Sequence, residues 1–226
     1  MNRGIRFFLG ALLLLVNACA TVPFAPTELT PTVPRSAAAL SDGLWSAGSG
    51  SLMVRQSALF EFGGMKVPIA GVMKLDRSAK VARLVGMNDM GVKLYDISVD
   101  AASSQAHFII QDLARYPGFA EAVASSVRRI FLYPEPAAGD TLERTKANYL
   151  LTRKSSDGGT TRFVFGGADS QLLEKQYRGP AGSWLVRYYQ YNRQQGHLFP
   201  GGIVLDDDRA GYRLTLWIES VEKSDE

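Results

Sequence analysis

Short segments of alternating apolar and polar residues, separated by turn residues, dominate the chain from residue 51 onward and most constrain its fold. Such alternation turns one face of a strand toward a core and the other toward solvent. We therefore predict about 11 strands in an antiparallel meander. They are expected at 51–62, 67–75, 80–87, 93–99, 106–111, 149–154, 161–165, 172–177, 184–191, 202–205 and 212–219.

One segment, 117–133, has a different period. Its apolar residues recur at three and four positions, and Pro117 can open a helix at its first turn. These spacings predict one substantial helix with a single apolar stripe pointing inward. The stripe consists of Phe119, Val123, Val127, Ile130 and Phe131.

A sheet of this size is expected to curl, because strands twist and because closure removes exposed edges. The expected product is a barrel or half-barrel. With about 11 strands and a helix nearby, the interior is either a ligand cavity or a space plugged by the helix and other side chains. The sequence leaves these two alternatives open.

The first 18 residues have the features of a signal peptide: Arg3 and Arg6 precede the apolar segment 7–16. This segment is far shorter than the roughly 20 residues of a membrane-spanning helix. The sequence before Cys19, Val-Asn-Ala-Cys, resembles the bacterial lipobox. We expect Cys19 to carry diacylglycerol and an N-acyl chain such as palmitate; the alternative is an ordinary secreted protein cleaved near Ala20. Without Asp after Cys19, the resemblance favours a Gram-negative outer membrane, with the chain facing the periplasm.

Residues 19–42, rich in Pro, Thr, Ala and Ser, are expected to form a flexible linker, and 43–226 a single domain. Removing the signal peptide removes two arginines, so Lys+Arg falls from 25 to 23 against 22 Asp+Glu. The mature chain is therefore nearly neutral and has no basic run. Nucleic acid is not an expected partner.

The sequence provides little for catalysis. It has two histidines, His107 and His197, a cysteine reserved for lipid attachment, and no Gly-x-Ser-x-Gly motif. The run Asp206-Asp207-Asp208 lacks the spacing of a calcium loop and is expected to be a solvated turn. We expect no enzyme activity, no catalytic residues, no metal and no cofactor beyond the lipid on Cys19.

Met90 is the most distinctive candidate site residue. It lies in the turn Asn88-Asp89-Met90-Gly91, between two predicted strands. A large apolar side chain at a turn is expected to be exposed, and exposed apolar tips often contact membranes or partner proteins.

Three segments resemble the LolA/LolB superfamily, which moves lipoproteins between bacterial membranes. Residues 83–91 resemble a strand and turn of the LolB-like receptor branch, 200–205 resemble its Pro-x-x-hydrophobic strand, and 212–221 its Trp-containing final strand. The resemblance implies a mainly β fold with some helix, an incomplete antiparallel β-barrel whose helices partly close an apolar cavity for acyl chains. It also implies that Met90 helps to pass cargo to the membrane.

Two functions follow as hypotheses. In the first, an outer-membrane lipoprotein binds acyl chains and assists transfer or insertion of lipoproteins or lipids, which a periplasmic carrier protein would deliver. Met90 would serve membrane handover, and Phe108, Phe119, Val123 and Val127 would form the cavity or its lid. In the second, a structural or assembly-scaffold lipoprotein has a filled barrel core and binds partners through its aromatic segment 184–191.

Overall fold

The computed structural model describes residues 22–194 and 197–224, which form one antiparallel sheet of 12 strands. The first strands are β1 (Ser51–Phe62), β2 (Met65–Asp76), β3 (Val81–Met87), β4 (Lys93–Val99) and β5 (Ser104–Ile109). The others are β6 (Thr141–Arg144), β7 (Asn148–Lys154), β8 (Thr160–Gly166), β9 (Gln171–Gly179), β10 (Gly182–Gln194), β11 (His197–Asp207) and β12 (Tyr212–Ser224). All 11 predicted strand segments are present, and β6 is the addition.

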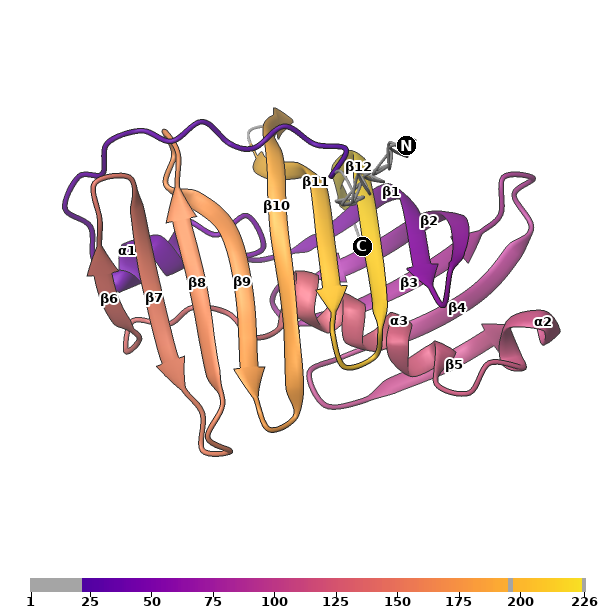
Figure 1. Ribbon diagram of the computed structural model, residues 1–226. Coiled ribbons are helices and arrows are strands. Elements are labelled where there is room, and N and C mark those ends of the chain that lie inside the picture. Colours follow the sequence, from indigo (N-terminus) through magenta and orange to yellow (C-terminus); the bar gives the residue numbers. More distant parts are fainter. Residues whose placement is uncertain (1–21, 195–196, 225–226) are drawn as a thin grey trace, which may run out of the picture.

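The sheet consists of two meanders that meet in the middle. Its order is β5-β4-β3-β2-β1-β12-β11-β10-β9-β8-β7-β6, so the last strand pairs with the first. The edges are therefore β5 and β6, which are also the strands on either side of the helical segment (Figure 1). The chain crosses from one edge to the other through α2 (Gln111–Ala114), α3 (Phe119–Val127) and the π-helical turn η1 (Arg128–Leu132). This connection places the helices across the open side of the sheet.

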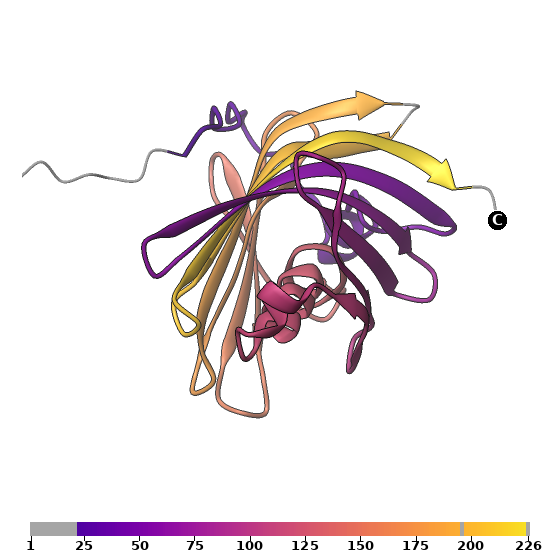
Figure 2. The same cartoon turned by 90° about the vertical axis from the view of Figure 1, so that its right-hand side faces the viewer.

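The sheet curls around these helices without closing, which confirms the expected incomplete barrel (Figure 2). Its concave face and the inward face of α3–η1 together form the core. Ile130, Phe131 and Leu132 are buried there against strand residues such as Met73, Ile97 and Ile203. The predicted apolar stripe therefore points inward.

The helix begins later than Pro117 predicts. Gly118 adopts a left-handed conformation (φ 83°), which ends the preceding turn and makes Phe119 the first residue of α3. The π-helical turn η1 follows α3 directly, so one continuous helical segment ends at Leu132.

Residues 22–36, which we name the strap, differ from the expected flexible linker. The strap runs along one end of the strands from β11 and β12 to β6 (Figure 1). Phe24 is buried against Tyr189 and Trp217, and its ring occupies the space that a side chain at Gly202 would fill. Apolar burial of one aromatic side chain stabilises this path.

A short helix follows the strap. In α1 (Ala37–Asp42), Ser36 caps the first turn by accepting from the Ala39 amide at 3.1 Å. Ala37 and Leu40 are buried in the main core. The folded unit therefore begins well before Gly43, and this replaces the linker boundary expected from composition.

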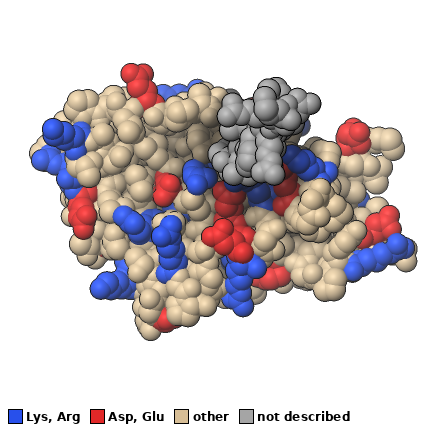
Figure 3. All heavy atoms as spheres, viewed as in Figure 1, with Lys and Arg blue, Asp and Glu red and all other residues tan. Residues whose placement is uncertain are grey.

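The surface has no strongly basic or acidic side in the view of Figure 3, where Lys and Arg alternate with Asp and Glu. Within the described residues, no helix combines the length and the apolar character needed to cross a membrane.

Candidate functional site

A cavity of about 600 Å³ lies between the concave face of the sheet and the helices α2 and α3. Its walls come from four places: the β1–β2 hairpin, Leu94 on β4, the segment 112–122 and the start of β12 with the turn before it. Most of the lining is apolar or aromatic, as in small-molecule pockets, which commonly measure about 300–1,000 Å³. The apolar and aromatic side chains include Phe60, Phe62, Met65, Val67, Ile69, Leu94, Leu113, Tyr116, Phe119 and Tyr212.

A smaller pocket of about 40 Å³ extends the cavity inward. Phe60, Ile69 and Phe119 line both spaces, so the two spaces lie next to each other. The inner pocket reaches Val123, Val127 and Ile130 on the helix and Gln56 on β1. An apolar trough thus follows β1 from Phe62 toward Gln56, beneath α3.

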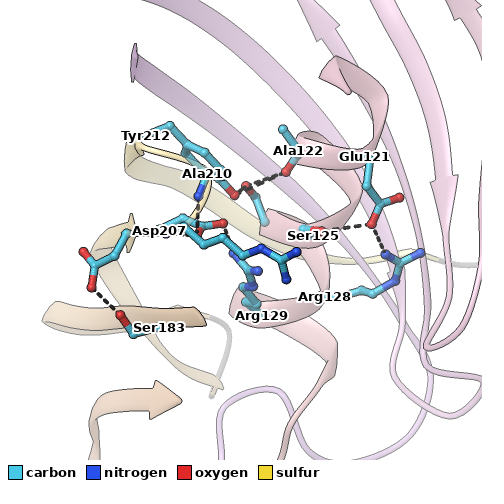
Figure 4. Close-up of polar contacts among 12 residues, drawn as sticks. Glu121, Ala122, Ser125, Arg128, Arg129, Ser183, Asp207, Ala210 and Tyr212 are labelled. Carbon is cyan, nitrogen blue, oxygen red and sulfur yellow. Dashed lines mark hydrogen bonds and ion pairs between the residues drawn. The ribbon is translucent and has the colours of Figure 1, made fainter. Parts of the chain in front are cut away.

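The helix α3 is fixed to the sheet by a polar cluster (Figure 4). Ser126 and Tyr212 hydroxyls are 2.8 Å apart, and Tyr212 also donates to the Ala122 carbonyl at 3.4 Å. Arg129 forms an ion pair with buried Asp207, whose other oxygen accepts from the Ala210 amide at 3.1 Å. Because removing one member of a buried pair is costly, this cluster holds α3 and η1 over the trough.

The helix α2 is held much less firmly. None of its residues is buried, and its N-cap residue Ile110 makes no side-chain capping bond. Segments with few buried contacts open at low free-energy cost. The mouth of the cavity, next to α2, is therefore its most easily widened part.

Exposed apolar side chains gather at the end of the sheet where the cavity opens. The register of β1, β2 and β3 places the β1–β2 turn and the β3–β4 turn at the same end of the sheet. Met65 and Tyr116 line the cavity, and Met90 and Val92 lie in the β3–β4 turn. We name these four exposed residues the mouth rim. An exposed apolar cluster next to an apolar cavity is typical of a surface that contacts membranes or partners.

Met90 is the most exposed of these residues, with 78% of its surface accessible. Its turn is rigid, because the Asn88 side-chain oxygen accepts from the Met90 amide at 3.0 Å and from the Val92 amide at 2.9 Å. Gly91 supplies the positive φ of 77° that the turn requires. The Met90 side chain is therefore exposed, as its position in the turn predicts.

The other predicted site residues fall in three places. Phe119 lines both the cavity and the inner pocket, and Val123 and Val127 line the inner pocket. Phe108 lies on β5, 43% exposed, with the Lys93 ammonium 5.9 Å from its ring centroid, and is not among the lining residues. Cys19 lies outside the described residues.

Sequence reasoning missed the strand and turn residues that build the mouth. Phe60, Phe62 and Tyr116 show no distinctive spacing, since alternation marks them only as one face of a strand or as loop residues. The contacts Phe60–Tyr212 (5.0 Å between ring centroids) and Phe62–Tyr116 (6.1 Å) join residues from distant segments. The available signal was the pair Phe60 and Phe62, two aromatic residues at alternate positions of one strand.

The aromatic segment of β10 is mainly internal. Trp184 and Tyr188 are buried, and the Tyr188 hydroxyl donates to the Ile130 carbonyl at 3.0 Å. Tyr191 donates to the Leu172 carbonyl at 2.6 Å, and burial raises the pKa of its hydroxyl. Trp184 and Tyr188 contact η1 residues, and Tyr191 packs against the core near β9.

In two polar regions outside the trough, arginine side chains form ion pairs with nearby carboxylates. An open pocket of about 550 Å³ beside η1 is lined by Arg128, Arg129 and Arg153, and each pairs with a carboxylate. The run 206–208 is not the expected solvated turn: Asp206 and Asp207 end β11, and Asp207 is buried. Asp206 pairs with Arg213 at 2.6 Å, and Asp208 accepts from Ser183 at 2.5 Å. Within the described residues, no group of three or more potential metal ligands comes together.

A comparison of this sequence with known protein families identifies its family. Residues 54–222 match the family described as "Protein of unknown function (DUF3261)". The chain belongs to the DUF3261 family. The match begins inside β1, so the strap and α1 of this DUF3261 chain precede the matched region. No curated protein sequence matches the chain.

Solved structures show what fold this DUF3261 chain has. A LolA superfamily protein from Nitrosomonas europaea is similar with a TM-score of 0.54 at 10% identity, covering 85% of this chain and 96% of that one. A structure assigned as an outer membrane lipoprotein-sorting protein domain from Vibrio parahaemolyticus gives 0.45 at 9% identity, with coverages of 78% and 86%. The first similarity shows a LolA-like fold, as the sequence resemblance implied.

Proposed function

We propose that this DUF3261 protein is an envelope lipoprotein that takes up an acyl chain of a lipid or lipoprotein in its apolar trough and releases it at a membrane. The observation that carries the proposal is the cavity of about 600 Å³ opening beside the exposed mouth rim. A chain leaving the trough would meet apolar side chains before it meets water. The proposed attachment point is Cys19, and the proposed location is the periplasmic face of the outer membrane.

Apolar burial is sufficient to drive such binding. Each buried methylene contributes about 0.8 kcal/mol, so ten of them contribute about 8 kcal/mol before the costs of ordering the chain and the lid. No covalent chemistry is required. We therefore propose a binding and transfer role without enzymatic activity.

The LolA-like fold also supports the proposed function. LolA superfamily membership of the Nitrosomonas europaea protein suggests a related envelope task, in which a periplasmic carrier delivers cargo to this chain. The direction of handover would then be from the carrier, through the trough, to the membrane at the mouth rim. The strap begins on β12, where Phe24 packs against Trp217, and lipid attachment at Cys19, three residues before residue 22, would tether this folded unit closely.

The test is native mass spectrometry of the chain from residue 19 onward, with Cys19→Ser so that no anchor is attached. Gentle purification from a bacterial periplasm would be followed by denaturing lipid extraction. Stoichiometric phospholipid or acylated peptide supports the proposal. A chain that carries no lipid and also fails to bind fluorescent fatty-acyl probes contradicts it and favours the assembly-scaffold alternative.

A further inference from the structure

Two glycines interrupt the apolar lining at the inner end of the trough. The pairings Gln56–Gly71, Gly71–Gly86 and Gly86–Tyr95 form one row across β1, β2, β3 and β4. The end residues of this row are polar and its two middle residues have no side chain. The row therefore offers space that flanking side chains can occupy.

Both end residues lean into that space. A Cβ on Gly71 would lie 3.3 Å from Gln56 Cγ and 3.4 Å from its Nε2, and a Cβ on Gly86 would lie 2.8 Å from the Tyr95 hydroxyl oxygen. Paired Cα atoms in neighbouring strands are only about 4.5–5.5 Å apart. The amide and the phenol thus lie above adjacent glycines on the concave face.

The Gln56 amide is buried without full hydrogen bonding. Only 5% of Gln56 is exposed, the residue borders the inner pocket, and its Oε1 has no hydrogen-bond partner among the described residues. A buried polar atom without a partner costs free energy, so its presence in an apolar trough calls for a ligand group. The carboxamide can both donate and accept.

Tyr95 adds a second neutral polar group at the same place. It borders the inner pocket, and its ring packs edge-on against Phe119 at 5.5 Å. Burial raises the pKa of the Tyr95 hydroxyl well above its usual value, so the group stays protonated. Ser126, which also borders this pocket, is already bonded to Tyr212.

We propose that Gln56 and Tyr95 form a polar contact for a hydroxyl group carried at the leading end of an acyl chain bound in the trough. An uncharged group fits, because Gln56 and Tyr95 bring no charge and an ionised group would lose its hydration. A hydroxyl also matches an amide and a phenol, which together offer donors and acceptors. This inference rests on the proposed acyl-chain function and specifies its ligand class.

The length of the trough fixes where the hydroxyl must lie. Phe62 at the mouth and Gln56 are six residues apart on β1, which corresponds to about 20 Å of strand. This is the scale of an extended long-chain acyl group. A chain entering with its hydrocarbon end first would therefore present a terminal or near-terminal hydroxyl to Gln56.

The experiment compares hexadecanoic acid with 16-hydroxyhexadecanoic acid as competitors of a bound fluorescent fatty acid, using the chain from residue 19 with Cys19→Ser. In the unsubstituted chain we expect the hydroxylated acid to bind at least as tightly as the plain acid. In Gln56→Leu, which keeps the volume but removes the amide, the ratio of the two dissociation constants should shift at least tenfold toward the plain acid. Gln105→Leu, the same change at an exposed position of β5, should leave the ratio unchanged.

A second variant, Tyr95→Phe, removes only the hydroxyl and keeps the ring against Phe119. We expect it to shift the same ratio in the same direction, by threefold or more. If both acids bind and the ratio is equal in all four chains, the polar contact is refuted while acyl-chain binding stands. If neither acid binds the unsubstituted chain, acyl-chain binding fails and the inference fails with it.

Discussion

The Tyr149 hydroxyl holds both backbone polar groups of Val33, accepting from its amide at 3.1 Å and donating to its carbonyl at 2.5 Å. Tyr149 is buried on β7, and Val33 belongs to the strap. One side chain thus replaces the two hydrogen bonds that a neighbouring strand would supply. Together with the bond from the Thr32 amide to the Lys146 carbonyl (3.0 Å), it docks the strap near the β6 edge.

Tyr149→Phe should therefore destabilise the fold by about 1–2 kcal/mol, because two strap backbone groups lose their partner while the ring remains. Urea unfolding followed by tryptophan fluorescence measures this loss. Tyr116→Phe, the same change at an exposed side chain, should have no measurable effect. Equal stability of the two variants would mean that the two hydrogen bonds between Tyr149 and Val33 do not stabilise the fold.

The strands were predictable because their signal is local. In β1 and β4 the alternation of side chains gave the observed bounds, since each strand turns one face to the same core. The short edge strand β6 (Thr141–Arg144) has mostly exposed polar residues and therefore no such alternation. Its pairing with β7 decides its conformation.

The strap and the cavity could not be predicted from local patterns, because both depend on contacts between residues far apart in the sequence. Phe24 lies in a Pro- and Thr-rich segment, yet it packs against Tyr189 and Trp217, more than 160 positions away. The trough likewise needs Gly71 and Gly86 in one row, which only the register reveals. Helical spacing identified Phe119 and Val123 as inward-facing, but their role as lining depends on the curl of the sheet.

Ala122→Phe should block the mouth of the trough. Ala122 lines the cavity from α3, opposite Phe60 and Phe62, so a benzyl group there would occupy space needed by the ligand. We expect at least about tenfold weaker binding of a fluorescent fatty acid, equivalent to about 1.4 kcal/mol. Ala101→Phe, an exposed position in the β4–β5 connection, is the control. Undiminished binding in Ala122→Phe would place the ligand elsewhere.

Met90→Glu should separate transfer from binding. Withdrawing a methionine side chain from a membrane contact loses about 1.5–3 kcal/mol, so transfer of a bound fluorescent lipid to phosphatidylglycerol-containing vesicles should slow about tenfold or more. Binding and unfolding should not change, because Met90 is exposed and its turn is held by Asn88.

The control for Met90 is Val81→Glu, which adds the same charge at an exposed apolar residue on β3, at the opposite end of that strand from the β3–β4 turn. Its transfer rate should equal that of the unsubstituted chain. Equal rates for both variants would remove Met90 from the handover.

Gly86→Ala should disturb the glycine row. The added Cβ would lie 2.3 Å from the Tyr95 ring carbons, so the ring must move within a packed core at a cost of about 1–3 kcal/mol. Gly139→Ala adds a methyl group with no atom within 4 Å and serves as the control. Urea midpoints of the two variants give the comparison, and no difference between them would mean that Tyr95 has free space to move.

Lys175 should make stability depend on pH. Its side chain is buried and donates to the Pro134 carbonyl at 3.0 Å, and burial lowers the pKa of Lys175 to about 7, against a partial opposing effect of Glu135. In the unfolded chain the lysine keeps its proton up to a pKa of about 10.4. Between these values the unfolded state binds one more proton, so raising the pH favours the folded state.

The free energy of unfolding should accordingly rise by about 2–3 kcal/mol between pH 7 and pH 9.5. Above pH 10 the buried tyrosines Tyr95 and Tyr188 act in the opposite sense, because burial raises the pKa of each above its ordinary value and unfolding then releases protons. Urea unfolding at several pH values up to 9.5 isolates the lysine. Lys175→Met should remove the rise and be more stable than the unsubstituted chain at pH 7, since an apolar side chain of similar length avoids the cost of burying an ammonium group. A rise that persists in Lys175→Met would assign the pH dependence to other groups.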